Sequence, residues 1–289
     1  MDEVTSNKSE VAAQSRALNA TDFATQYTLQ FIESVTERRP NLRFLEVGCG
    51  KGHLARALVD KGHQVLPIDV SEEAVAFARS LGLPPKQTDI FGINDTAFDG
   101  ILFIQSLHHI TPLDQSLDQA TRLLDGDGFV LVDDFAFNKI DENTAAWFQG
   151  VQNVLAVAGI GAFHCVEIEK AFSHLVNHYS GHGIHTGEEL IRALRNTFRK
   201  VEISEGGTYL YRYFVSKMES RPEGGDLIKA IFDWENFRSK NESFRGSGFA
   251  QSVLSDPSDS DTLVVRALKI SRLIRQLPGG MPPTYETMH

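Results

Sequence analysis

The chain has 289 residues, 42% of them hydrophobic, and carries a formal net charge of -10. This length allows one large domain with additions or two small domains, and the apolar content is sufficient for a sizeable core. The acidic excess, with no dense stripe of Lys or Arg to offset it, argues against a protein that binds nucleic-acid phosphates.

The composition also bears on the compartment. The two cysteines, Cys49 and Cys165, lack metal-site spacing and do not indicate a disulfide framework. The polar N-terminus lacks the apolar core of a signal peptide, and no stretch reaches the roughly 20 apolar residues of a membrane span. We therefore expect a cytoplasmic protein with no membrane partner.

Residues 1–40 are predicted to comprise a flexible segment and one helix. The first part is polar and rich in Ser and Asn. Apolar residues then recur every four positions, which predicts a helix with one buried stripe. This helix is expected to be capped by Thr21 or Asp22 and to end before Pro40.

Strands and helices alternate strictly over the following segment. This order predicts parallel strand pairing through right-handed crossovers. Ser71 is the expected cap of the second helix, and Asp125-Gly126-Asp127-Gly128 predicts a tight turn into the last strand. The expected strands are 43–47, 64–68, 86–90, 98–104 and 129–132, and the expected helices are 52–61, the helix after Ser71, and 112–124.

The pattern changes after the fifth strand. Residues 135–185 are predicted to form a helical insertion, and Thr186 is the expected cap of a helix over 187–196. Within the insertion, His174, His178 and His182 would share one helical face if the helix continued. Gly181 and Gly183 argue that it ends first, and no Cys or carboxylate completes a metal-binding set. We therefore expect no metal site.

Two segments, 198–204 and 208–216, predict an antiparallel hairpin at the edge of the sheet. Tyr209, Tyr211 and Tyr213 alternate on one face of the second predicted strand. Tyr211 is a candidate for a polar contact with a substrate. The alternative is that these residues form an ordinary amphipathic edge strand.

Residues 217–289 are predicted to be a helical C-terminal extension. Helices are expected over 223–240 and 262–277, on either side of a Ser- and Asp-rich loop at 241–261. The last helix is amphipathic, so its apolar face would be buried against the parent sheet or in a second copy of the chain. A homodimer through this extension is one expectation.

A glycine-rich loop, Glu46-Val47-Gly48-Cys49-Gly50-Lys51-Gly52, follows the first predicted strand. Such glycines let the backbone approach a ligand, and the N-terminus of the next helix favours polar or anionic groups. A dinucleotide fingerprint would need its third glycine where His53 stands. The carboxylate of Glu46 would also repel a pyrophosphate, whereas it would suit the ammonium of a methionine moiety.

The run Glu46-x-Gly48-x-Gly50-x-Gly52 is similar to the first motif, E/D-x-G-x-G-x-G, of class I S-adenosylmethionine-dependent methyltransferases. The resemblance covers residues 40–134 well and extends weakly to 216. It implies a three-layer Rossmann-like α/β fold with a mostly parallel seven-stranded sheet. It also implies S-adenosyl-L-methionine as cofactor, S-adenosyl-L-homocysteine as product, and a cofactor-binding methyltransferase domain over 41–216. The helical insertion over 135–185 is the expected substrate lid of this domain.

The resemblance implies roles for residues at the strand ends. Asp69 matches the acid that holds the ribose hydroxyls, since a carboxylate can accept from two vicinal hydroxyls. Asp89 matches the acid that contacts the adenine amino group, and Val70 suits contact with the adenine face. The cofactor contacts expected from the resemblance are Glu46, Gly48, Cys49, Gly50, Gly52, Asp69, Val70, Asp89, Ile90, Gln105 and Ser106.

Two histidines after the fourth strand, His108 and His109, are the candidates for a catalytic base. Imidazole titrates near neutral pH and can accept a proton from a hydroxyl or an ammonium. The structural alternative is that one of them packs beneath the loop and binds a backbone carbonyl. The sequence does not decide between the two roles.

The predicted function is methylation of a small-molecule acceptor at oxygen or nitrogen, because the long insertion favours a discrete pocket. Gln105-Ser106-Leu107-His108 departs from the Asn/Asp-Pro-Pro-Tyr/Phe motif of enzymes that methylate bases or glutamine amides. Two alternatives stay open: methylation of a protein, and a protein that binds the cofactor without transferring its methyl group.

Overall fold

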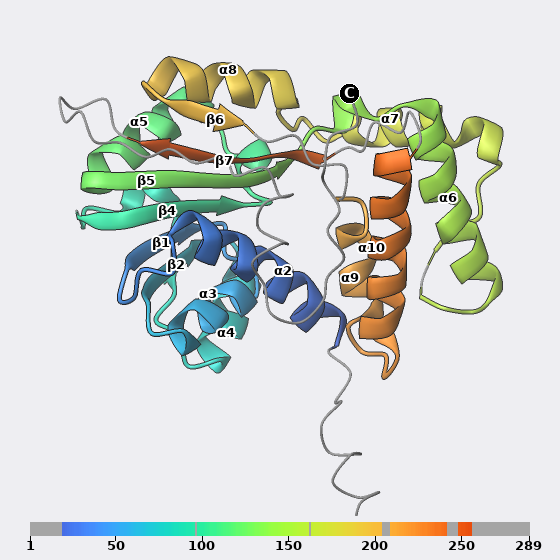
Figure 1. Ribbon diagram of the computed structural model, residues 1–289, viewed down its shortest axis with the longest axis horizontal. Helices are drawn as coiled ribbons and strands as arrows, with labels where there is room; N and C mark the ends of the chain where they lie inside the picture. The colour runs from blue at the N-terminus through green and yellow to red at the C-terminus, as the bar shows by residue number, and fades with distance from the viewer. Residues whose placement is uncertain (1–18, 96, 162, 204–208, 242–247, 256–289) are drawn as a thin grey trace, which may run out of the picture.

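The computed structural model describes residues 19–95, 97–161, 163–203, 209–241 and 248–255. Within these residues the chain forms an α/β structure with helices on both faces of a mostly parallel sheet (Figure 1). This arrangement confirms the predicted Rossmann-like fold class. The parallel strands are β1 Arg43–Val47, β2 Gln64–Asp69, β3 Lys86–Gln87, β4 Phe98–Ile104 and β5 Leu124–Phe135.

The order of the strands determines where a ligand can bind. The sheet runs β3-β2-β1-β4-β5-β7-β6, so β1 lies between β2 and β4 and is parallel to both. The chain first builds outward from β1 to β3 and then returns to place β4 beside β1. Open parallel sheets bind ligands at such a switch point, outside the carboxyl ends of the strands. The candidate site therefore lies beyond Val47 and Ile104.

Neighbouring residues of the inner strands point to opposite faces of the sheet and build two separate cores. Phe44 and Leu102 pack on one face beneath α2, α3 and α4. Leu45 and Ile101 pack on the other face with α5 and α8. The helices of these layers are α2 Ala20–Val35, α3 His53–Asp60, α4 Glu72–Ser80, α5 Leu113–Leu123 and α8 Gly187–Thr197.

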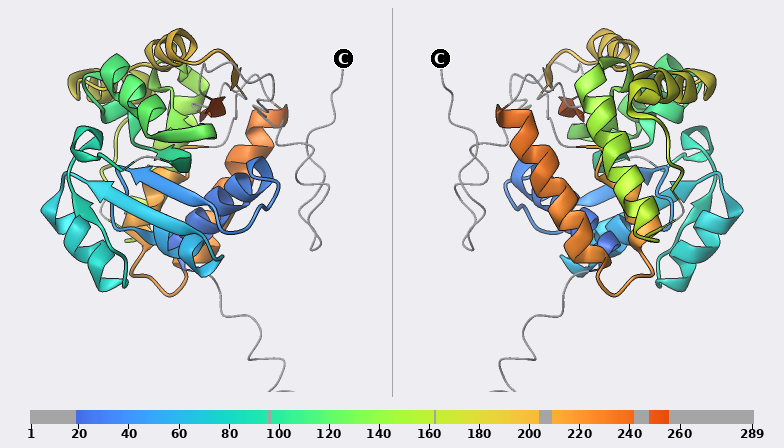
Figure 2. Two further views of the ribbon diagram at one scale, coloured as in Figure 1. Left: turned by 90° about the vertical axis from the view of Figure 1, so that its left-hand side faces the viewer. Right: turned by 90° about the vertical axis from the view of Figure 1, so that its right-hand side faces the viewer.

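A third apolar cluster lies at one end of the sheet, where four more helices gather (Figure 2). Its aromatic side chains meet edge to face; the ring centroids of Phe148 and Phe214, for example, are 5.4 Å apart. Two of the helices, α6 and α7, come from the insertion predicted at 135–185. The four are α6 Glu142–Val157, α7 Ala171–Gly181, α9 Arg212–Met218 and α10 Gly224–Asn241.

The prediction of a strand over 208–216 is wrong, because residues 212–218 form helix α9. Leu210, Phe214 and Met218 recur every four residues and are all buried, which is the period of a helix. The alternation of the tyrosines masked this longer period. The tyrosines therefore do not share one face of an edge strand.

The antiparallel edge of the sheet is built from different residues than predicted. Strand β6, Val201–Ile203, pairs antiparallel with β7, Gly248–Ser255, and β7 also pairs antiparallel with β5. Strand β7 falls inside the segment 241–261, which was predicted to be a loop. Its seven pairs with β5 depend on long-range contacts that no local pattern announces.

Other differences are local. Helix α2 is capped by Asn19 and not by Thr21 or Asp22, since the Asn19 side chain accepts a hydrogen bond from the Asp22 backbone. Strand β5 begins at Leu124, so the predicted turn at 125–128 lies within the strand, next to a shift in its register with β4. The predicted capping box at Thr186 is present at the start of α8.

Some predictions fall outside the described residues. These are the flexible segment up to residue 18 and the amphipathic helix over 262–277, on which the dimer expectation rests. Among the helices of the described residues, none is both long enough and apolar enough to cross a membrane.

Candidate functional site

The glycine loop after β1 passes close to two neighbouring elements. Gly48, Gly50 and Gly52 all have positive φ angles, of 73°, 51° and 77°. Residues other than glycine rarely adopt this conformation. A Cβ atom on Gly48 would lie 2.6 Å from the Cβ of Ser106, and one on Gly52 would lie 2.8 Å from the Cβ of Ala78. The loop therefore needs glycine for close approach at two positions, whereas Gly50 has open space around it.

Glu46 lies at the end of β1 and is only 3% exposed. Burial raises the pKa of its carboxyl to about 8, against a hydrogen bond from the Ala55 backbone that lowers it. Its Oε2 atom has no hydrogen-bond partner. A buried carboxylate oxygen without a donor is costly, and a cationic group of a ligand would satisfy it.

Cys49 is buried in the same loop. Burial raises the pKa of its thiol to about 12, and the nearby carboxyls of Glu46 and Asp69 act in the same direction. The thiol is therefore protonated at neutral pH and is a poor nucleophile. Its role in the loop is that of a small packing residue.

Asp69 ends β2 and holds the glycine loop in place. Its Oδ2 accepts a hydrogen bond of 2.8 Å from the Gly50 backbone, and its Oδ1 accepts one of 2.9 Å from the Ser71 backbone. A carboxylate oxygen has two acceptor positions, so each oxygen of Asp69 can still accept a hydroxyl of a ligand.

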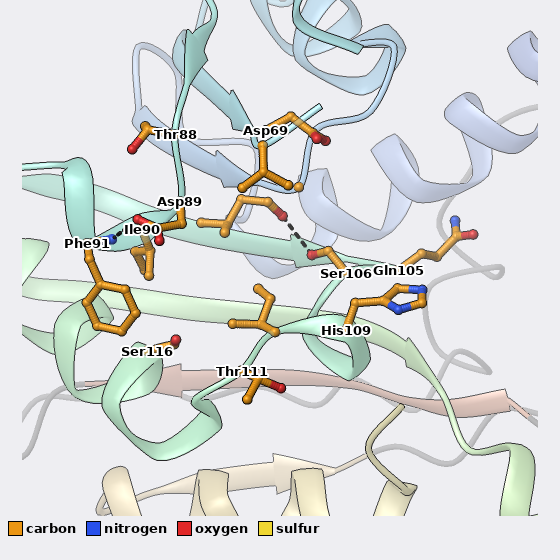
Figure 3. Close-up of a pocket in the computed structure, with 14 residues that line it drawn as sticks. Asp69, Thr88, Asp89, Ile90, Phe91, Gln105, Ser106, His109, Thr111 and Ser116 are labelled. Carbon is orange, nitrogen blue, oxygen red and sulfur yellow. Dashed lines mark hydrogen bonds between the residues drawn. The ribbon is translucent and has the colours of Figure 1, made fainter. Parts of the chain in front are cut away.

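A cavity of about 440 Å³ opens at the carboxyl ends of β1, β2 and β4 (Figure 3). Val70 is 70% exposed and lies on its wall, so it is not a core residue of the sheet. The cavity is lined by Val47, Gly48, Asp69, Val70, Thr88, Asp89, Ile90, Phe91, Gln105, Ser106, His109, Ile110, Thr111 and Ser116.

Asp89 lines one side of this cavity at the start of a single helical turn, η1, over Ile90–Gly92. Its Oδ1 accepts hydrogen bonds from the backbone N–H groups of Phe91 and Gly92. This turn ends β3 earlier than predicted. An apolar surface, formed by Ile90 and Phe91, lies beside the Asp89 carboxylate in the cavity.

Gln105 and Ser106 line the opposite side, directly after β4 (Figure 3). Gln105 has a φ angle of 56°, which is uncommon for a residue other than glycine, and its N–H donates to the Asp133 carbonyl at 2.7 Å. The Ser106 hydroxyl donates to the Val47 carbonyl at 2.6 Å. These bonds tie the end of β4 to both of its neighbouring strands, so this wall of the cavity is well supported.

The two candidate histidines occupy different positions on the turn η2, Leu107–His109. His109 lines the cavity, whereas His108 is buried behind it against the carboxylate of Asp134. Their ring centroids are 4.1 Å apart. Burial, and next the neighbouring His108, lower the pKa of His109 below its ordinary value. His109 is therefore a neutral imidazole near neutral pH and can accept a proton.

Tyr211 does not reach this cavity. Its side chain is fully buried in the helical cluster, where its ring packs edge to face against Phe23, Tyr27 and Phe232. The expectation of a substrate contact rested on an edge strand, and the structure has helix α9 there instead.

The insertion places further histidines near the site. The ring centroids of His178 and His182 are 4.4 Å apart, and α7 ends at Gly181. The backbone N–H of His185 donates to the carbonyl of His108 at 2.9 Å. Within the part of the chain that the structure describes, no group of three or more His, Cys, Asp or Glu is arranged to hold a metal ion.

Sequence reasoning missed Asp134, together with Thr88, Thr111 and Ser116 on the cavity wall. A signal for Asp134 was available, since two acids at the end of an apolar strand are unusual in a buried position. Thr88 and Thr111 lie in bends and Ser116 lies in the first part of α5, and none of the three carries a comparable signal.

The region that forms the site matches a known family. Residues 45–132 match the family model described as "Methyltransferase domain". A ubiquinone biosynthesis O-methyltransferase from Idiomarina loihiensis is 26% identical over 132 residues, which are 43% of this chain and 52% of that protein. A second one, from Leptothrix cholodnii, is 37% identical over 62 residues, 22% of this chain and 26% of that protein. The matches thus span about half or less of the curated relatives.

Solved structures are similar at lower identity. The plantazolicin methyltransferase BamL, in complex with a triazolic desmethylPZN analog and SAH, aligns over 87% of this chain and 91% of its own, with 14% identity and a TM-score of 0.49. A likeness at this level does not define an acceptor.

Proposed function

Because the chain carries a class I S-adenosylmethionine-dependent methyltransferase domain, we propose that it transfers the methyl group of S-adenosyl-L-methionine to the oxygen or nitrogen of a small-molecule acceptor. The observation that carries this proposal is the cavity at the switch point. It brings an acid from β2, an acid after β3 and a candidate base after β4 to one cavity.

The residues present fit the cofactor. Glu46 offers an unpaired buried carboxylate oxygen to the ammonium of the methionine part. Asp69 has free acceptor positions for the ribose hydroxyls, and Asp89 would accept from the adenine amino group. Val70, Ile90 and Phe91 supply apolar surface for the adenine ring. Glycine at position 48 avoids a clash, because a Cβ atom at this position would meet the side chain of Ser106.

The bound cofactor would supply an electrophilic methyl group, and the chain's residues would position the acceptor and take up a proton. A hydroxyl or ammonium acceptor must lose a proton during the reaction. His109 lies on the cavity wall and can accept this proton on a ring nitrogen. Burial lowers the pKa of His109, so its ring is neutral near neutral pH. Gln105 and Ser106 would hold the acceptor side of the cavity, since the Ser106 hydroxyl binds β1 and the Gln105 backbone binds β5.

Two observations bear on the acceptor. The helices α6 and α7 of the insertion pack into the cluster at the end of the sheet, next to the segment around His185 that binds the His108 backbone. This position of the insertion beside η2 supports a small acceptor. The curated relatives from Idiomarina loihiensis and Leptothrix cholodnii are named as O-methyltransferases, which supports an oxygen acceptor.

The test has two stages. Calorimetry first measures binding of S-adenosyl-L-methionine and of its demethylated product to the parent chain, to Asp69→Asn, and to the exposed control Asp60→Asn. We expect binding by the parent and the control and a loss of roughly tenfold or more in Asp69→Asn, from two hydroxyl bonds to a charged group.

The second stage incubates the protein and methyl-labelled cofactor with an extract of its source cells, and mass spectrometry follows the label. Label in the small-molecule fraction supports the proposal. Label in the protein fraction instead would indicate a protein methyltransferase. Cofactor binding without any labelled product would contradict methyl transfer.

A further inference from the structure

We propose that Asp134 is a positioning residue for the candidate base: it fixes the ring of His108, and His108 in turn supports the ring of His109 at the cavity wall. The catalytic meaning of this inference rests on the proposed function, but the arrangement itself can be measured without an acceptor.

Asp134 is one of two consecutive acids at the end of β5, and they face opposite ways because neighbouring residues of a strand alternate. Asp133 pairs with the buried guanidinium of Arg212 at 2.7 Å, on the side of α2 and α9. Asp134 is fully buried and faces η2 instead. The two adjacent carboxylates therefore have separate partners, and each can be changed without removing the other.

Three donors contact the carboxylate of Asp134. Its Oδ2 accepts a hydrogen bond of 3.0 Å from the His108 backbone, and its Oδ1 contacts the His108 Nδ1 atom. The Phe135 backbone also donates to Oδ1, at 2.8 Å. An ionised carboxylate only accepts, so Nδ1 of His108 must carry its proton. A partner of this kind fixes both the tautomer and the orientation of an imidazole.

The fixed ring of His108 is in direct contact with His109. Their planes are tilted by 44° at the 4.1 Å centroid separation. The turn is closed by the backbone N–H of His109, which donates to the Ser106 carbonyl, and it is held from outside by the N–H of His185, which donates to the His108 carbonyl. His109 thus packs against a side chain that Asp134 holds, while His109 itself lines the cavity.

Charged and titratable groups reach His109 from three elements. His108 of η2 and His182 after α7 disfavour its protonated form, whereas the carboxylate of Asp134 in β5 favours it. A purely structural role for Asp134, as a cap of the η2 backbone, would leave the tautomer and the titration of these rings unchanged. A positioning role would alter both.

The experiment is nuclear magnetic resonance of the histidine rings in the full chain, with Asp134→Asn compared to the parent. A neutral amide cannot accept from the His108 ring and both backbone donors at once. We expect the parent to show His108 as the Nδ1–H tautomer and Asp134→Asn to lose that form. We also expect the titration midpoint of His109 to move to lower pH, because a neighbouring negative charge is removed.

The matched control is Asp133→Asn, the adjacent buried acid that faces Arg212. It should leave the tautomer of His108 and the midpoint of His109 as in the parent. If Asp134→Asn does not fold, as judged by circular dichroism, His108→Asn serves in its place. This change removes a group that disfavours protonation, so the midpoint of His109 should then move to higher pH.

An unchanged His108 tautomer and an unchanged His109 midpoint in Asp134→Asn, or an unchanged midpoint in His108→Asn, would overturn the inference. Calorimetry with S-adenosyl-L-methionine separates this failure from failure of the proposed function. A parent that shows the expected ring tautomer but does not bind the cofactor would refute the function and leave the arrangement of Asp134, His108 and His109 standing.

Discussion

Two buried glutamates, in two regions of the molecule, face the same physical problem and meet it differently. Glu46 lies at the carboxyl edge of the sheet, and Glu235 lies in the cluster of helices at the end of the sheet. Burial raises the pKa of the first to about 8 and of the second to about 7. Glu235 accepts hydrogen bonds from three consecutive backbone N–H groups, whereas one oxygen of Glu46 has no partner.

This difference in hydrogen-bond pairing distinguishes a carboxylate with a structural role from one that can still bind a ligand. Glu235 satisfies the free N–H groups before α9, and so fixes a helix that carries its own buried residues Phe214 and Met218. Glu46 has one donor, the Ala55 backbone, and leaves its other oxygen open next to the glycine loop. Complete pairing indicates a role in stability, and incomplete pairing in a buried position indicates a role in binding.

The largest effect is expected for Glu235→Ala. Three buried N–H groups lose their acceptor, so the free energy of unfolding should fall by about 4 kcal/mol. Chemical denaturation measures it. The control is Asp233→Ala, which removes an exposed carboxylate two residues before Glu235 on α10 and should cost less than about 1 kcal/mol. Equal losses in the two variants would mean that the cap at Tyr209, Leu210 and Tyr211 contributes little.

The second effect concerns Glu46→Gln without cofactor. A carboxyl whose pKa is raised on folding retains its proton longer in the folded state, so it lowers stability as pH rises from about 4.5 to about 8. Glutamine carries no such charge. The variant should therefore gain stability over the parent through this window, by about 3 kcal/mol at pH 7. Thermal unfolding of the parent and of Glu46→Gln across this pH range measures the gain. A difference in stability between them that did not change with pH would mean that Glu46 is not buried. The exposed control Glu73→Gln should show such a constant difference from the parent.

The third effect uses the same variant with cofactor present. If the open oxygen of Glu46 pairs with the ammonium of S-adenosyl-L-methionine, Glu46→Gln should bind it about 100-fold more weakly, close to 2.7 kcal/mol. Calorimetry measures this loss. A variant that is more stable when free yet binds as tightly as the parent would break the distinction drawn between Glu46 and Glu235.

The same contrast explains what the sequence could predict. The strands at 43–47 and 98–104 were located to the residue, because short-range patterns and the glycine loop determine them. Asp69 was placed on the cavity by its position at a strand end. These features depend on neighbours in the chain, and local periodicity is enough to find them.

Features that depend on distant pairing were missed. The contact of Asp134 with His108 follows from the alignment of Ile104 with Asp133 across β4 and β5, which no local pattern specifies. Helix α9 was predicted as a strand because the alternating tyrosines masked the four-residue spacing of its buried residues, and because Glu235, which accepts from the N–H groups before it, comes from a later helix. Long-range contacts therefore decided the element type where local propensity was ambiguous.

The smallest effect is expected for two glycines of the loop that carries Glu46. Their comparison tests whether the close approach of the loop to β4, in addition to its backbone conformation, shapes the candidate cofactor site. Gly48→Ala and Gly50→Ala both place a side chain at positive φ, which costs roughly 1 to 2 kcal/mol. Only the Cβ at position 48 would meet Ser106, at 2.6 Å, so the walls from β1 and β4 must move apart there. We therefore expect Gly48→Ala to bind S-adenosyl-L-methionine about tenfold more weakly than Gly50→Ala. Equal affinities by calorimetry would mean that the contact of Gly48 with Ser106 yields without disturbing the site, and that positive φ alone explains both glycines.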